Sequence, residues 1–303
     1  MKPLPTLALL VVAACDRARV EPPSRSALLR AADELLAVDR AFAAAAATTD
    51  LVAGVTAMFA ADVVVSAQGS FADGIAAASA VLRGDTLNLT SRAHWEPVRT
   101  GISADGSHGF TIGNFDVARA DGSVIPGKYL AYWVNGVEGW RVKVWRRGRR
   151  PDGPADTTRF EPSLPSHIVA PTADTGVIAG HRWALEQAER DFSAEAQVVG
   201  IGPAFAKFGR ADAMHLGGPD IVGFIVGNDA IAASVQEGTP EGTSPVTWGP
   251  ERAIVASSGD LGVTIGWIVA KNSPRGGGAP ARFPFFTIWR RDEVGSPWRY
   301  IAE

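Results

Sequence analysis

The chain repeats one ordered set of landmarks, and this internal repeat constrains its fold more than any other feature. Residues 111–113 (TIG) recur letter for letter as residues 264–266, at a separation of 153 residues. Five more landmarks recur in the same order, at separations between 149 and 158 residues: RAF 40–42 and RDF 190–192, Phe59 and Phe208, Trp95 and Trp248, Trp133 and Trp289, Trp140 and Trp298. Because chance would not keep the order over six landmarks, the sequence predicts a tandem duplication.

The length agrees with two domains, since domains average roughly 150 residues and this chain has 303. We predict a first domain over residues 28–148 and a second over residues 177–303. Residues 149–176 contain five prolines and few apolar side chains, which is typical of a semi-stiff linker. A cluster of four arginines ends the first copy and is interpreted as a solvated strand end, with contact to anionic lipid headgroups as the alternative: Arg146, Arg147, Arg149 and Arg150.

The N-terminal segment has the pattern of an export signal. Lys2 precedes a short apolar run, and small residues follow it, so residues 1–15 are predicted to be a signal peptide. Residues 12–15 (VAAC) resemble the bacterial lipobox, which implies lipidation of Cys15 and a tether over residues 16–27. We therefore expect an exported lipoprotein, anchored through Cys15 to the periplasmic side of the cell membrane. The alternative is an ordinary cleaved signal in which Cys15, the only cysteine, is incidental.

Each copy has the periodicity of helices followed by strands. Apolar residues at helical spacing predict long helices over residues 28–47 and 180–199. Short helices and one strand follow in each copy, and the C-terminal part of each copy alternates as strands do. DG at 105–106 and SG at 258–259 suit tight hairpin turns between those strands. This order predicts an α+β fold with an antiparallel meander in each domain.

The landmarks resemble one known family. The Arg-x-Phe helix end, the pattern Gly127, Tyr129, Trp133 and the closing residues 139–141 (GWR) are similar to the SnoaL-like branch of the nuclear transport factor 2-like superfamily. The second copy departs slightly, with Phe285 at the tyrosine position. The resemblance implies two tandem cone-shaped domains, each a long N-terminal helix and short helices packed on a curved antiparallel sheet around a pocket. That superfamily includes ketosteroid isomerase, dehydratases, an epoxide hydrolase, cyclases and many members without a known reaction, so it says little about function.

Charge and motif content exclude several classes of function. A formal net charge of −3 provides no basic field for nucleic acid, so we expect no nucleic-acid partner. No two of the five histidines share a metal-ligand spacing on one element, and we expect no metal. Residues 200–202 (GIG) lack the third glycine of a dinucleotide fingerprint, and we expect no cofactor.

Two residues are candidates for acid/base chemistry. His215 stands on a predicted strand near the expected pocket, and Glu96 follows Trp95 on another strand. The competing interpretation of His215 is a histidine outside the core, satisfied by water or backbone. The catalytic dyads and triads of enzymes with this fold match no positions in this chain, which lowers the expectation of an enzyme.

Aromatic side chains are the candidates for ligand binding. Residues four apart on one strand face the same side, as Tyr129 and Trp133 do. These aromatics are expected either to line two apolar pockets or to form the core between helix and sheet. The candidate set is Trp95, Tyr129, Trp133, Trp248, Trp267, Phe285 and Trp289.

The favoured hypothesis for function is non-catalytic binding of a small apolar or aromatic ligand. The alternatives are an isomerase, dehydratase or hydrolase with pocket acid/base chemistry, and a structural interaction module. We also expect the two domains to pair within the chain, because burying two sheet faces against each other requires no second chain.

Overall fold

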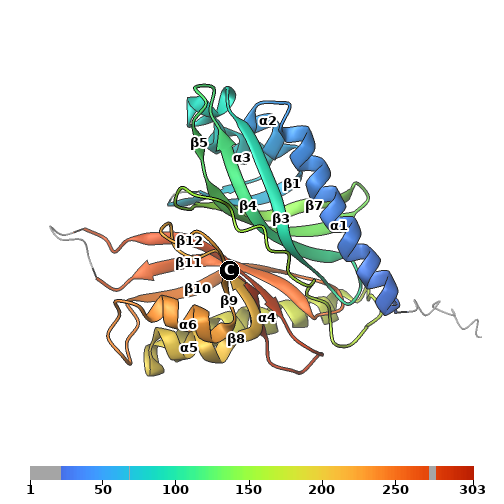
Figure 1. Ribbon diagram of the computed structural model, residues 1–303. Helices are drawn as coiled ribbons and strands as arrows, with labels where there is room; N and C mark the ends of the chain where they lie inside the picture. Colours follow the sequence, from blue (N-terminus) through green and yellow to red (C-terminus); the bar gives the residue numbers. More distant parts are fainter. Residues whose placement is uncertain (1–21, 68, 273–277) are drawn as a thin grey trace, which may run out of the picture.

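The computed structural model describes residues 22–67, 69–272 and 278–303, drawn in colour in Figure 1. The predicted signal segment and Cys15 lie outside these residues. Among the helices of the described part, none is long and apolar enough to cross a membrane.

The first domain is built on a long helix that crosses one mixed sheet. Ser24 and Asp50 cap the first two helices, each accepting a backbone N–H bond at the N-terminus. The elements of this domain are α1 (Arg25–Ala46), α2 (Leu51–Thr56), β1 (Phe59–Ala67), β2 (Ser70–Asp73), α3 (Ile75–Arg83), the 3-10 turn η1 (Thr86–Leu89), β3 (Arg92–Ile102), β4 (His108–Ala118), β5 (Val124–Ile125), β6 (Gly127–Gly136) and β7 (Gly139–Arg149).

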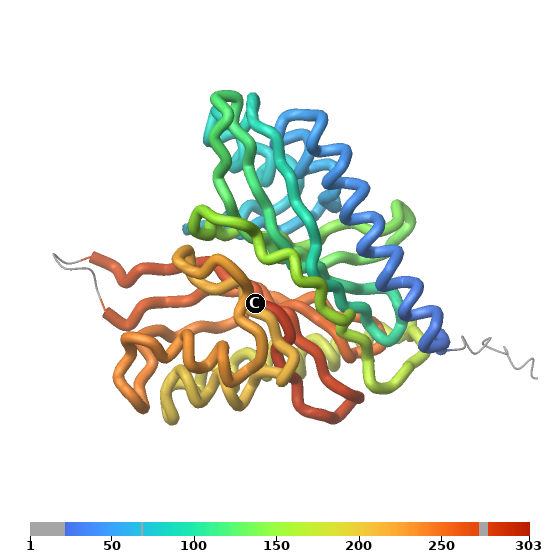
Figure 2. Tube along the Cα trace, viewed as in Figure 1, coloured from blue at the N-terminus to red at the C-terminus, as the bar shows by residue number. Residues whose placement is uncertain are grey.

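The second domain repeats this plan. Its elements are α4 (Thr175–Val199), α5 (Ile201–Phe208), β8 (Gly209–His215), β9 (Ile225–Val226), α6 (Asn228–Gln236), β10 (Val246–Val255), β11 (Leu261–Ala270), β12 (Arg282–Arg290) and β13 (Arg299–Ala302). The strand order is β2-β1-β7-β6-β4-β3 in the first sheet and β10-β11-β12-β13-β8-β9 in the second, which is the same order read from the other edge. In Figure 2 the two chain paths follow matching courses, the first domain above the second.

The predicted α+β class is confirmed, with long helices packed on curved sheets. One feature of each sheet differs from a pure antiparallel meander: β1 pairs with β7, and β8 with β13, in parallel. These parallel pairs join the strand that follows the first helices to the last strand of the same domain. Each sheet is thereby curled around its long helix.

The repeated TIG landmark marks the bend in each sheet. A Cβ on Gly113 would lie 2.2 Å from the carbonyl oxygen of Glu96, and one on Gly266 would lie 2.0 Å from that of Gly249. Both glycines stand opposite a register shift in the neighbouring strand. Such bulges bend a strand, and the close approach of two backbones leaves room only for glycine.

The outer faces of the two sheets pack against each other. One continuous buried cluster draws residues from both domains, including Phe110 and Ile112 of the first and Ile265 and Phe286 of the second. Arg99 of β3 donates to the carboxylate of Asp212 on β8 at 2.6 Å. Burial of these faces gives the chain a third hydrophobic layer between its two domain cores (Figure 1).

The contact between the domains has an internal two-fold character. Asp105, in the turn after β3, accepts from the backbone N–H of Ser258 at 3.0 Å. Asp260, in the matching turn after β10, accepts from the backbone N–H of Ala104 at 2.9 Å. Equivalent turns therefore bind each other reciprocally, as the two subunits of a two-fold dimer do.

The linker between the domains follows the edge of the first sheet. Ser163 donates its N–H to the carbonyl of Thr100 at 2.8 Å and accepts from the N–H of Ile102 at 3.0 Å. Phe160 donates to the carbonyl of Val98 at 2.9 Å. Backbone hydrogen bonds thus hold the Pro-rich linker along β3.

Candidate functional site

A buried carboxyl lies at the centre of the first domain. Asp39 on α1 is fully buried and accepts from Trp95 Nε1 at 2.7 Å and from the Tyr129 hydroxyl at 2.5 Å. Burial raises the pKa of Asp39 above its ordinary value, while the hydrogen bonds from Tyr129 and Trp95 act in the opposite direction. The indole of Trp133 donates a hydrogen bond to the hydroxyl of Thr111 at 2.9 Å, which adds Trp133 to this buried centre.

The second domain carries the same arrangement. Glu189 on α4 accepts from Trp248 Nε1 at 2.7 Å, from Trp289 Nε1 at 3.0 Å and from the Thr264 hydroxyl at 2.5 Å. Burial raises the pKa of Glu189 to about 7, against the effect of these three hydrogen bonds. The two carboxyls stand 150 residues apart, so they are counterparts in the repeat.

These carboxyl centres explain most of the aromatic residues singled out in the sequence. Trp95, Tyr129, Trp248 and Trp289 donate directly to a carboxylate that the sequence reasoning missed. Each carboxylate oxygen already accepts at least one hydrogen bond in the structure. The centres therefore tie the long helix to the sheet and offer no open position to a substrate.

A small cavity lies beside the second of these centres. It has a volume of about 80 Å³, and aromatic and aliphatic side chains form its walls together with one carboxyl: Ile201, Phe205, Trp248, Ile268, Phe285 and Glu303. Oε2 of Glu303 is buried and has no hydrogen-bond partner among the described residues. Burial and the negative charge of Glu189 raise the pKa of Glu303 to about 8, although Arg146 acts in the opposite direction.

The first domain fills the equivalent space. Trp140 and Trp298 are counterparts in the repeat and lie 158 residues apart. At the same separation, Trp145 is the counterpart of Glu303. Trp145 is buried between the rings of Phe59 and Phe115, each with its centroid 5.7 Å away. The polar cavity is thus a property of the second copy.

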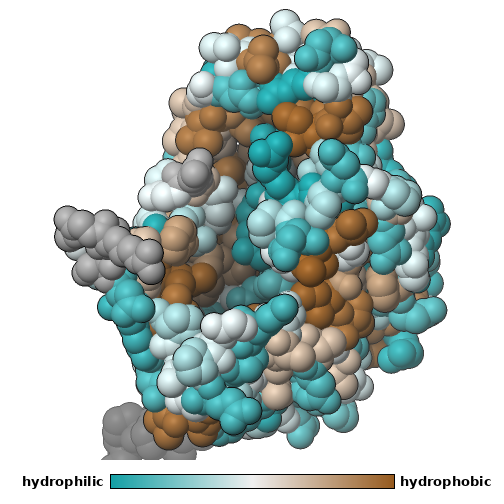
Figure 3. Space-filling model, turned by 60° about the vertical axis from the view of Figure 1, so that its left-hand side comes forward, coloured by the Kyte–Doolittle hydropathy of each residue, from teal (hydrophilic) through white to brown (hydrophobic). Residues whose placement is uncertain are grey.

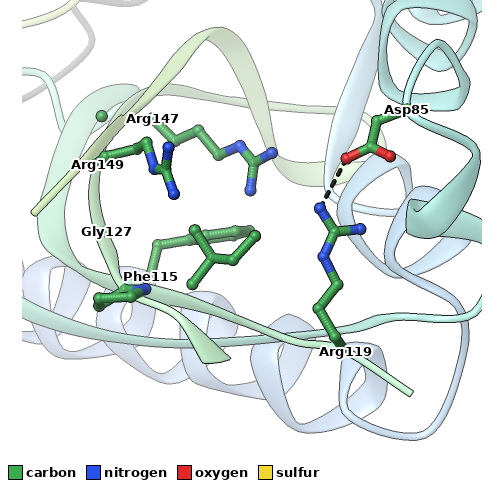
Figure 4. A pocket seen from close by; sticks show the side chains of 9 residues that line it. Asp85, Phe115, Arg119, Gly127, Arg147 and Arg149 are labelled. Atoms are coloured by element: carbon green, nitrogen blue, oxygen red, sulfur yellow. Dashed lines mark hydrogen bonds and ion pairs between the residues drawn. The ribbon is translucent and has the colours of Figure 1, made fainter. Parts of the chain in front are cut away.

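A larger pocket opens in the first domain at a different place (Figure 4). Its volume is about 430 Å³, and Arg119, Arg147 and Arg149 all line it. Asp85 is the carboxylate in its lining and pairs with Arg119 at 2.7 Å. Phe115 lies beneath Arg147, 5.7 Å from its ring centre to the guanidinium carbon, and is 1% exposed. The pocket combines an excess of positive charge with the apolar side chains of Ile125 and Pro126.

Two other arginines lie close enough to Arg147 to affect its titration. Desolvation and then the positive charges of Arg119 and Arg149 lower its pKa, and Asp85 acts in the opposite direction. Within the described residues, neither Arg147 nor Arg149 has an ion-pair partner, whereas Arg150 is buried and pairs with Asp116 at 3.3 Å. A bound anion would stabilise the guanidinium groups that the protein leaves unpaired.

The arginine cluster is therefore divided between different environments. Arg146 lies over the ring of Phe286 in the other domain, with 5.6 Å between its guanidinium carbon and the ring centre. Arg147 and Arg149 line the pocket, and Arg150 is part of a buried ion pair. The interpretation as a solvated strand end holds for Arg147 and Arg149, which are exposed at the end of β7, and fails for Arg150, which is buried, because the pattern of four charges does not show which strand face each occupies.

The two predicted acid/base candidates lie apart from the cavities described above. His215 accepts from the backbone N–H of Gly217 at 2.9 Å, and burial, with Arg146 and Lys128 nearby, lowers its pKa to about 3. Glu96 pairs with Arg40 at 2.9 Å and with Arg159 at 3.4 Å. Among the described residues, no hydrogen bond or ion pair joins His215 to Glu96. In the described part of the chain, no group of three or more His, Cys, Asp or Glu side chains could hold a metal ion.

The predicted aromatic ligand-binding residues have three different positions. Trp248 and Phe285 line the cavity of the second domain. Trp95, Tyr129, Trp133 and Trp289 belong to the buried centres. Trp267 lies on the other face of the second sheet and contacts Phe71 of the first domain, with ring centres 4.9 Å apart.

In the view of Figure 3, the outer surface shows no cluster of one kind of side chain comparable to the buried aromatic centres. Hydrophobic groups there form separate patches between hydrophilic ones. Single exposed apolar residues such as Leu87 and Val124 are ordinary for a folded protein. The interior sites are therefore the better guide to function.

Among known proteins, only solved structures show a likeness to part of this chain. No family model and no curated protein matches the sequence. Among solved structures, a nuclear transport factor 2-like protein with a cystatin-like fold from Novosphingobium aromaticivorans is 20% identical with a TM-score of 0.34, over 43% of this chain and 88% of that one. A nuclear transport factor 2-like superfamily protein from Salmonella enterica is 13% identical with a TM-score of 0.33, over 41% of this chain and 94% of that one. A ketosteroid isomerase-like protein from Erwinia carotovora is 20% identical with a TM-score of 0.31, over 40% of this chain and 99% of that one.

Each of these structures spans less than half of the chain, about the length of one domain. Their names agree with the superfamily that the sequence resembles. Identities of 20% and below concern the fold alone, and they bear on neither ligand nor reaction.

Proposed function

We propose that the protein is a non-catalytic binder of small organic anions that carry a flat apolar group. The observation that supports this most is the pocket of about 430 Å³ in which three guanidinium groups face one carboxylate. The hypothesis from the sequence was an apolar or aromatic ligand. The arginines of the pocket favour a ligand of this kind that also carries a negative charge.

The chemistry of the lining defines the ligand class. Guanidinium groups bind carboxylate and phosphate oxygens through paired N–H bonds. Arg119 is held by Asp85, which leaves Arg147 and Arg149 for the ligand. Ile125 and Pro126 are partly exposed and provide the apolar surface against which an aromatic ring would lie.

The same lining favours binding over catalysis. General acid/base chemistry needs a group that changes protonation near the working pH. Arginine stays protonated there, and the hydrogen bond from Arg119 lowers the pKa of Asp85 below its ordinary value. Within the described residues of this pocket, the side chains are suited to hold a charge and not to move a proton.

The location is part of the proposal. Lipidation of Cys15 would place the pocket at a membrane surface on the exported side of the cell. Mass spectrometry of the protein from its own cells would test this, since a lipidated N-terminal cysteine has a characteristic mass. An unmodified Cys15 would leave the ligand proposal intact and remove the anchor.

The binding proposal is tested by calorimetry with benzoate, phenyl phosphate and neutral benzyl alcohol. We expect the two anions to bind and the alcohol to bind at least about tenfold more weakly, since one charge-assisted contact contributes about 1.4 kcal/mol or more. Arg147→Gln should weaken the binding of the two anions by a similar factor, because it removes a guanidinium group without opening a cavity. Arg182→Gln, at an exposed position of α4, is the matched control and should change nothing. Equal affinity for the alcohol and the anions would contradict the proposal.

A further inference from the structure

We propose that the cavity of the second domain is a separate binding site for a short alkylammonium group, with the carboxylate of Glu303 as its counter-ion. The group is either a small free amine or the end of a larger molecule. This site is independent of the arginine pocket, which belongs to the first domain.

The carboxyl is held in place beside the hydroxyl of Thr287, and its Oε2 lacks a hydrogen-bond partner among the described residues. The backbone of Glu303 donates to the carbonyl of Met214 at 3.0 Å and accepts from the N–H of Leu216 at 2.9 Å, so the residue is fixed beside β8. Its side chain lines the cavity, and Oε2 is buried without a hydrogen bond. A buried polar atom without a partner is rare and costly, and a ligand that donates to it would remove this cost.

The charges around the cavity favour a cation. Glu189 lies near enough to affect the titration of Glu303, so the two carboxyls add their negative charges once they ionise. Arg146, the positive group that acts on Glu303, belongs to β7 of the first domain and lies over Phe286. Both an ammonium group and the unpaired carboxylate would gain from contact in this medium of low polarity.

The walls of the cavity fit the remainder of such a ligand. Trp248, Phe205 and Phe285 present aromatic surfaces, and aromatic rings attract ammonium groups. A cavity of 150 Å³ accommodates benzene, so one of about 80 Å³ holds about three non-hydrogen atoms. Ethylammonium has this size.

The comparison between the copies supports a dedicated site. The first domain has Trp145 where the second has Glu303, and that tryptophan is packed within the core. A carboxyl in place of a tryptophan lowers the stability of a core unless something offsets the unsatisfied oxygen. A ligand for Glu303 provides this offset.

The experiment is calorimetric titration of the full chain with ethylammonium chloride, in two buffers of different ionisation enthalpy at neutral pH. We expect saturable binding with release of up to one proton, because Glu303 with a pKa of about 8 is mostly protonated at that pH and must ionise to pair with the cation. Potassium chloride controls for ionic strength, and ethanol is the neutral molecule of the same size. Neither should give saturable binding.

Two variants test the site itself. Glu303→Gln keeps the volume of the side chain and removes its charge. This variant should weaken the binding of ethylammonium at least about tenfold and abolish the release of a proton on binding. Phe285→Trp keeps the carboxyl and fills the space, and it should also weaken binding. Glu251→Gln removes an exposed acid from the same domain and is the matched control. Binding that survives both cavity variants, binding of ethanol with equal affinity, or an absence of saturable binding would each overturn the proposal.

Discussion

At the scale of the residue, one buried carboxyl per domain organises the aromatic core. Asp39 and Glu189 were missed in the sequence because a charged residue within a helix ordinarily faces solvent. A signal was present, since each stands directly before an arginine that the repeat matches, Arg40 and Arg190. Two acids at equal positions opposite matched tryptophans would have indicated a shared hydrogen-bonding role. The position of Glu303 could be found in the same way, by extending the repeat beyond Trp298.

The raised pKa of Glu189 predicts a specific pH dependence of stability. Between the ordinary value of 4.5 and the folded value of about 7, the folded chain binds more protons than the unfolded chain. The free energy of unfolding should therefore fall as pH rises through this window and then level off, by about 3 kcal/mol from this one group. Glu189→Gln imitates the protonated form and should lose this part of the slope.

Urea denaturation of the wild type and of Glu189→Gln at about pH 5 and about pH 8 measures the difference. Glu195→Gln on the same helix, where the side chain is 27% exposed and pairs with Lys207, is the control and should retain the wild-type slope. Equal slopes for Glu189→Gln and the wild type would show that this carboxyl titrates in the folded chain as it does in the unfolded one.

At the scale of the element, the matched glycines of the TIG landmarks set the bend of each sheet. In Gly266→Ala the new methyl group would lie 2.0 Å from the carbonyl oxygen of Gly249, so two backbone segments must separate. Overpacking of this kind costs typically about 2 kcal/mol. We expect Gly266→Ala to lower the urea midpoint accordingly.

The control for this bend is Gly249→Ala on the facing strand, where an added Cβ would meet no atom within 4 Å. It should leave the free energy of unfolding within about 0.5 kcal/mol of the wild-type value. If the two alanine variants were equally stable, the close approach of the strands would not be what requires glycine at position 266.

The elements show which parts of the fold a sequence can predict. The end of α4 was predicted at Val199, where the structure places it, because hydrophobic periodicity is a local property. The parallel pairing of β1 with β7 was not predicted, since it joins segments about 80 residues apart and depends on how the sheet curls around α1. Short strands such as β5 and β9, of two residues each, are too brief to produce a period.

At the scale of the whole molecule, one buried ion pair joins both domains and the linker. Arg290 on β12 donates to Asp260 at 3.0 Å, to the carbonyl of Ile102 at 2.8 Å and to that of Ser163 at 3.1 Å. Asp260 in turn accepts from the backbone N–H of Ala104 in the first domain. The pair is almost fully buried, so removal of one member leaves an uncompensated charge inside the contact between the domains.

Arg290→Leu should therefore lower the free energy of unfolding by about 3 to 5 kcal/mol, the range found when one partner of a buried ion pair is removed. Arg282→Leu is the matched control on the same strand, because Arg282 pairs with Glu251 at 2.9 Å but both side chains are about half exposed. An exposed pair contributes less than about 1 kcal/mol. Urea denaturation followed by tryptophan fluorescence measures both variants. A loss as small for Arg290→Leu as for Arg282→Leu would mean that the apolar faces alone hold the domains together, since the cost of an unpaired Asp260 would then have been relieved by water entering the contact.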